Sequence, residues 1–185
     1  MKRYISILIL FSILIVAVSG CTNNTIQNKT FNNSGLTFQY PGNWSDNATI
    51  TWTSGDNSQN DTIGTLGNGN VTAGILYINL TKEPLLKSYN ITTLGNLATA
   101  SWKTGANGNN TNVISQTSRK VNNLTIVEVI YTTPDPVTNV LYKYYYVLTG
   151  KQGQSAYILR FGAPEADFSK YYPQFQSIAN SIKVE

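Results

Sequence analysis

The stretch "GLTFQYPGNWS" (residues 35–45) is where the sequence first becomes able to form a packed domain. Apolar Leu36, Phe38 and Tyr40 alternate with polar residues in it, and this period of two predicts a half-buried strand. The Pro-Gly-Asn sequence that follows predicts a turn. Because the whole chain has 185 residues, the length of one domain, the later elements are expected to complete a single core with this strand.

The rest of the sequence predicts further strands and two helices. The turn-rich residues 54–70 predict a loop or loose hairpin, and apolar residues at helical spacing near the end predict a closing helix that Pro173 kinks or restarts. The expected strands cover residues 48–53, 73–81, 113–119, 124–132, 140–149 and 155–162, and the expected helices residues 93–104 and 164–182. Short turns between the later strands indicate an antiparallel meander. The expected fold class is therefore α+β, with helices packed on one antiparallel sheet.

The two ends of this region resemble those of a known family. "GLTFQYPGNWS" resembles the opening of PsbP-like domains, and "FQSIANSIKV" (residues 175–184) is similar to their closing helix and tail. The resemblance assigns residues 34–185 to a PsbP-like domain and implies an α/β/α sandwich, Trp44 in its core, and a non-catalytic accessory or binding role. PsbP itself is a subunit of photosystem II, but surface lipoproteins share the fold. The metal-linked histidines of the photosynthetic branch have no counterpart, because this chain contains no His.

The first twenty residues have the plan of a signal peptide. Lys2 and Arg3 form a positive start, residues 5–18 are apolar, and Ser19 and Gly20 are small. The apolar run is shorter than the ~20 residues that span a bilayer as a helix, which argues against a permanent membrane span.

Cys21 is the single cysteine, and it follows that segment directly. "VSGC" resembles the lipobox of prolipoproteins, which implies a lipid on Cys21 and residence on the extracytoplasmic face of the cell membrane. An uncleaved anchor and a simple secretory signal are the alternatives. Residues 22–33 are polar and predict a flexible tether of twelve residues, which spans at most ~40 Å.

N-x-S/T sequons are more frequent than composition explains. The sequence has eleven, whereas 22 Asn and 37 Ser plus Thr in 185 residues would yield roughly four by chance. The excess favours a glycosylated surface, and an archaeal one would suit both modifications, although Asn and Thr also pair locally in turns. The sequons expected at accessible turns or strand ends are those of Asn43, Asn47, Asn60, Asn70, Asn109 and Asn123.

Charge and residue types exclude several functions. The formal charge is +4, two of these charges lie in the leading segment, and the rest are scattered, so no basic stripe for nucleic acid exists. The absence of His removes imidazole-based catalysis and the commonest transition-metal ligand. Residues 56–61, "DNSQND", only superficially match a calcium loop, because Asp61 stands where Gly is needed and Gly67 where Glu is needed. We expect no cofactor or metal.

Carboxylates remain as possible catalytic groups, and the alternative function is a cell-envelope hydrolase that uses two of them. The sequence has only nine acidic residues, and Glu128 alone lies well inside an expected strand. Val127 and Val129 occupy the opposite face of that strand, so we expect Glu128 to be exposed to solvent.

The stretch "YKYYYV" (residues 142–147) is the most suggestive binding feature. Period two places Tyr142, Tyr144 and Tyr146 on one face of a strand and the residues between them on the other. If a helix covers one face only, Lys143 and Tyr145 are left as a surface for a sugar or a partner protein. The alternative is that every ring lies under a helix with only its hydroxyl in water.

Overall fold

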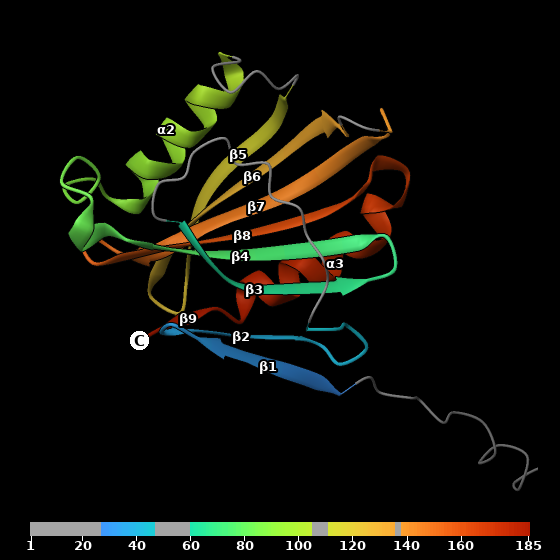
Figure 1. Cartoon of the computed structure of the whole chain (residues 1–185), viewed down its shortest axis with the longest axis horizontal. Coiled ribbons are helices and arrows are strands. Elements are labelled where there is room, and N and C mark those ends of the chain that lie inside the picture. Colours follow the sequence, from blue (N-terminus) through green and yellow to red (C-terminus); the bar gives the residue numbers. More distant parts are fainter. Residues whose placement is uncertain (1–26, 47–59, 105–110, 136–137) are drawn as a thin grey trace, which may run out of the picture.

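The computed structural model describes residues 27–46, 60–104, 111–135 and 138–185 (Figure 1). The signal segment, Cys21 and the expected strand at 48–53 lie outside these residues, as do Asn47 and Asn109.

A six-stranded antiparallel sheet forms the centre of the domain, with strand order β3-β4-β8-β7-β6-β5. Its strands are β3 (Asn60–Asn68), β4 (Val71–Asn79), β5 (Asn112–Val121), β6 (Leu124–Pro134), β7 (Leu141–Lys151) and β8 (Ser155–Pro164). The expected meander is confirmed, since β5 to β8 pair in sequence order. The β5–β6 turn is the predicted Asn-Asn turn, in which Asn122 and Asn123 have φ of 48° and 68°.

A second, three-stranded sheet is the main departure from the expected single sheet. It consists of β1 (Asn28–Asn33), β2 (Leu36–Pro41) and β9 (Lys183–Val184), in the order β1-β2-β9. The tether expected over 22–33 is therefore wrong for 28–33, which pair with β2 along their length. Phe31 is the one apolar residue of β1, and its ring stacks on Phe38 at 4.7 Å. An edge strand with a single apolar residue gives no alternating pattern.

Within residues 54–70, expected to form a loop or loose hairpin, residues 60–68 form the regular strand β3, the first strand of a hairpin with β4. It pairs with β4 over its whole length, with a bulge between Thr62 and Gly64. A Cβ on Gly64 would lie 2.4 Å from the ring of Phe31, so this glycine lets the small sheet pack against β3. Because Gly and Thr leave β3 with few apolar residues, the sequence shows no clear strand pattern there.

The helices cover opposite faces of the large sheet. α2 (Ile91–Lys103) and α3 (Glu165–Asn180) confirm the two expected helices, and α3 continues through Pro173. Side chains of α3 pack with Tyr145 and Val147, whereas side chains of α2 pack with Tyr146 and Leu148, the alternate residues of β7. A short 3-10 helix, η1 (Leu80–Lys82), follows β4.

Trp44 lies in the core on the α3 side, as the family resemblance implied. It is 1% exposed, its ring meets Phe175 edge to face at 6.2 Å, and its indole Nε1 donates to Gln174 Oε1 at 3.2 Å. Among the described residues, no helix is both long and apolar enough to cross a membrane.

Candidate binding surfaces

Tyr145 is buried, which corrects the expected binding surface at Lys143 and Tyr145. It is 1% exposed, because α3 covers the face of β7 that was expected to be open. Its ring meets Tyr172 of α3 edge to face at 5.4 Å and stacks near Phe161 at 6.0 Å. Lys143 is partly buried, with its ammonium 5.3 Å from the centre of the Phe168 ring. Neither residue offers a free platform.

Glu128 lies on the α3 side of the sheet and is largely buried, so its expected exposure is wrong. The side chain is 13% exposed, and both carboxylate oxygens accept from Arg119, from Nε and Nη2 at 2.8 Å each. The Tyr145 hydroxyl donates to the same carboxylate. Val127 and Val129 do lie on the opposite face, as predicted, but the α2 side and the α3 side are both covered.

Electrostatics around Glu128 favour a fixed negative charge. Burial alone raises the pKa of the Glu128 carboxyl, but hydrogen bonds from Arg119 and Tyr145 outweigh it and hold this pKa below its ordinary value. Burial and the Glu128 carboxylate raise the pKa of Tyr145 far above its ordinary value. Glu128 is thus an ionised, doubly paired carboxylate, whereas a general acid needs a raised pKa.

Two other carboxylates in the described ranges, those of Asp46 and Asp135, also have partners. Asp46 accepts from the Tyr40 hydroxyl at 2.5 Å and lies 3.9 Å from the Lys29 ammonium. Burial and Asp46 raise the pKa of Tyr40 to about 12. Asp135 accepts from the backbone N–H of Thr138 at 2.7 Å, which closes the turn before β7. Within the described part of the chain, no three His, Cys, Asp or Glu residues are grouped so as to hold a metal ion.

A row of aromatic rings lies on the α2 side of the sheet. The Trp102 ring lies 4.8 Å from that of Tyr131, Tyr131 stacks on Tyr144 at 5.0 Å, and Tyr142 follows Tyr144 at 6.1 Å. The Arg160 guanidinium lies 4.1 Å from the centre of the Tyr144 ring. We call these five residues the ring row.

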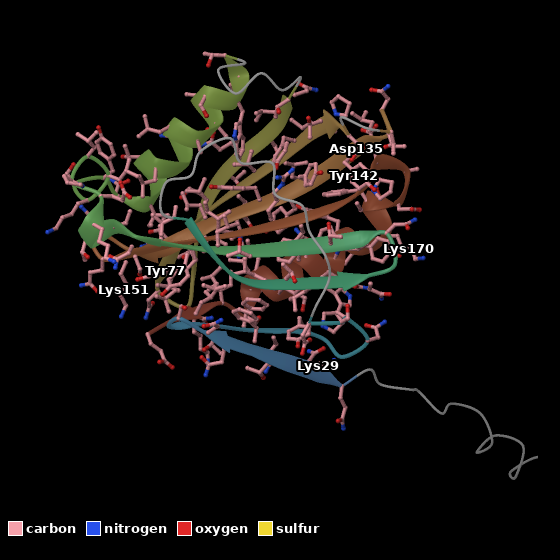
Figure 2. All side chains as sticks on the ribbon, viewed as in Figure 1. Lys29, Tyr77, Asp135, Tyr142, Lys151 and Lys170 are labelled. Carbon is pink, nitrogen blue, oxygen red and sulfur yellow. The ribbon has the colours of Figure 1, made fainter. Side chains whose placement is uncertain are left out.

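The ring row becomes more exposed towards the end of the sheet. Tyr131 is buried, which raises its pKa to about 12, whereas Tyr142 and Tyr144 are half-buried. A Cβ on Gly162 would lie 2.5 Å from Tyr144 Cε1, so Gly162 lets this ring lie close against β8. Figure 2 places Tyr142 near Asp135 at the outer end of the sheet. The accessible aromatic face of "YKYYYV" is thus the one opposite to the face expected.

A groove lies between the small sheet and α3. It has a volume of about 280 Å³. Its lining comes from β1, β2 and α3, namely Asn28, Gln39, Tyr40, Pro41, Pro173, Gln174, Ser177 and Ile178. The lining carries no charged side chain, and the nearby Lys29 is already paired with Asp46.

The described sequon residues lie mostly at the surface. Asn43, Asn70 and Asn123 are exposed, as expected, and Asn60 begins β3. Asn79 and Asn90 instead cap η1 and α2, where their side-chain oxygens accept from the backbone N–H of Thr81 and Thr93. Part of the sequon excess therefore has a local structural use.

Comparison with protein families decides where the chain belongs. A family model described as PsbP matches residues 27–184. The chain belongs to the PsbP family. The match begins one residue before β1, so the PsbP domain includes the strand that the sequence had suggested was tether.

Solved structures agree on the fold. The solution structure of cyanobacterial PsbP (CyanoP) from Synechocystis sp. PCC 6803 has a TM-score of 0.61 at 11% identity, covering 91% of this chain and 99% of that chain. A crystal structure from Bacteroides thetaiotaomicron VPI-5482 has a TM-score of 0.50 at 14% identity, covering 86% of this chain and 49% of that chain. A search of curated proteins finds no match. At such identities the likeness shows the fold alone.

Two partners in these sites were missed from the sequence. Arg119 pairs with Glu128 because the turn at Asn122 sets the β5–β6 register, which places Thr117 opposite Glu128 and Arg119 two residues away on the same face. Arg160 stacks on Tyr144 because the β7–β8 register places Gly162 opposite that tyrosine. Counting outward from the predicted Asn-Asn turn would have found the first pair, whereas the second depends on the Lys151–Ser155 pairing, which the sequence did not predict.

Proposed function

We propose that this chain is a lipid-anchored, N-glycosylated protein of the extracytoplasmic membrane face, and that its PsbP domain has a non-catalytic binding role. The observation that carries the proposal is the leading sequence, in which a basic start and the apolar residues 5–18 run into "VSGC". Cys21 precedes β1 by seven positions, so a lipid there is compatible with every element of the fold.

The binding role is supported by the ring row. Tyr142 and Tyr144 are half-buried rings that lie side by side, 6.1 Å apart, with the Arg160 guanidinium against the second ring. Partly exposed aromatic faces with hydroxyl groups suit the apolar face and polar rim of a sugar or of a partner protein. A non-catalytic role is supported by Glu128, whose carboxylate is neutralised by Arg119.

Glycosylation is proposed at the exposed sequons, foremost Asn123 in the β5–β6 turn. An archaeal surface would combine such glycans with a lipid anchor. Intact-mass analysis of native protein tests this, because Thr125→Val removes the sequon and leaves Asn123 in its turn. We expect the mass of the wild type to exceed that of the variant by one glycan in addition to the side-chain difference. If the two masses differ by the side chains alone, and Asn43 and Asn70 are unmodified as well, the glycosylation proposal is contradicted.

The anchor is tested by metabolic labelling with a lipid precursor in wild type and Cys21→Ser. We expect label in wild type only, while the domain of the variant keeps its circular dichroism spectrum, because position 21 precedes all described elements. Loss of cleavage would leave residues 5–18 as a residual anchor, so membrane fractionation alone does not suffice. Equal labelling of both proteins would overturn lipid attachment at Cys21.

A further inference from the structure

The point at which β1 begins limits how the domain can sit on a membrane. A twelve-residue tether would span ~40 Å and permit any orientation. β1 begins instead at Asn28, seven positions after Cys21, so the chain between the two Cα atoms spans at most ~25 Å. This limit depends on covalent length alone.

The domain is wider than that reach. A domain of this size has a radius of gyration of about 15 Å and therefore a diameter of ~40 Å. If the start of β1 lay on the side away from the membrane, the linking chain would need to pass the whole domain, which ~25 Å does not allow. Part of this maximal span of ~25 Å is also needed to cross the headgroup layer, which is ~5 Å or more thick on each side of the bilayer. The start of β1 must lie in the half that faces the membrane.

Figure 1 shows which elements would then lie near the membrane and which would lie far from it. β1 and β2 run along one edge of the molecule, and α2 lies at the opposite edge. Asn28 pairs with Pro41, and both line the groove together with Pro173 of α3. Figure 2 shows Lys29 at this same edge. The ammonium of Lys29 is balanced by Asp46, so this edge is polar without a described excess of basic charge.

We propose that the face around the start of β1, formed by Asn28, Lys29, Pro41 and Pro173, rests against the lipid headgroups, while α2 points away from the membrane. The proposal depends on the proposed function, since it requires the lipid on Cys21. It also explains how a domain without a basic patch is oriented: two acyl or ether chains hold it, and the short link sets its direction.

The test uses the lipidated full-length protein in phosphatidylcholine vesicles that contain a nitroxide-headgroup lipid. Cys21 is the only native cysteine and is consumed by the lipid, so a second cysteine accepts a fluorophore alone. Thr30→Cys places it in β1, where it also removes the Asn28 sequon, and the matched control Ala100→Cys places it on α2; both positions are exposed. We expect the label at position 30 to lose most of its emission and the label at position 100 to keep most of its own.

A linker variant tests the cause of the difference. Twelve Gly and Ser residues inserted after Asn24 raise the maximal reach to ~65 Å, and the two labels should then be quenched more equally. An unchanged difference after insertion would overturn the short link as the cause. Equal quenching in the uninserted protein, or stronger quenching at position 100, would overturn the orientation while the anchor stands. Protein that does not float with the vesicles would overturn the anchor itself.

Discussion

Each face of the six-stranded sheet is covered by a helix, but the two faces differ in how completely their aromatic side chains are buried. On the α3 side, Trp44, Phe161 and Phe175 are each 0–1% exposed and pack ring to ring. On the α2 side, the helix covers Val127 and Val129, but Tyr142 and Tyr144 stay half-buried. The comparison indicates that the α3 face holds the fold, whereas the outer end of the α2 face is available for contact.

The largest effect is expected on the α3 side. Trp44→Ala removes a fully buried indole and its hydrogen bond to Gln174, so it should lower the free energy of unfolding by ~4 kcal/mol. Guanidinium unfolding followed by circular dichroism measures the loss. A loss below ~1 kcal/mol would show that the α3 face does not carry the fold.

A middle-sized effect is expected from the Arg119–Glu128 ion pair on the α3 side of the sheet. Glu128→Gln leaves the half-buried Arg119 without its carboxylate and should cost ~2 kcal/mol at pH 7. The folded-state pKa of Glu128 is lowered, so its stabilisation is present above the unfolded pKa of ~4.3 and is lost as the pH falls through the folded pKa. The stability gap between wild type and variant should therefore shrink below about pH 4. A gap that is constant from pH 7 to pH 2 would contradict this assignment.

A smaller effect on stability is expected at Gly162 of β8, against which the Tyr144 ring of the ring row lies. Gly162→Ala places a methyl group 2.5 Å from Tyr144 Cε1, and because this ring is only half-buried, the cost of displacing it should be ~1 kcal/mol. Tyrosine fluorescence quenching by acrylamide should rise as the ring becomes exposed. A cost of ~3 kcal/mol or more would mean that the ring row is as rigid as the α3 face.

The smallest effect on stability is expected at the end of the ring row. Tyr142→Ala should change the free energy of unfolding by only ~0.5 kcal/mol, because the side chain is half-buried and contacts Tyr144 alone among the described ring pairs. The same variant should weaken any glycan or protein that a surface screen recovers with wild type. Retention of the partner at unchanged affinity would remove the ring row from the binding role.

The sequence predicted elements whose apolar period was clear and missed those without one. The helices at 93–104 and 164–182 were found within about two residues of α2 and α3, because their apolar residues recur at helical spacing. β1 was missed, and β3 was expected only as part of a loop or loose hairpin, because Asn, Thr and Gly dominate both strands and pairing with β2 and β4 supplies their stability. Tyr145 was misplaced for another reason: alternation shows which residues share a face but not whether a helix covers it.

Lipid attachment at Cys21 is the claim on which the surface role depends most directly. Mass spectrometry of the N-terminal peptide of the native protein tests it in one measurement. The expected peptide begins at Cys21 and carries the added mass of two acyl or ether chains joined through glycerol to its sulfur. A mature chain that begins elsewhere, or a peptide with an unmodified Cys21, would contradict the lipid anchor and with it the orientation set by the short link to β1.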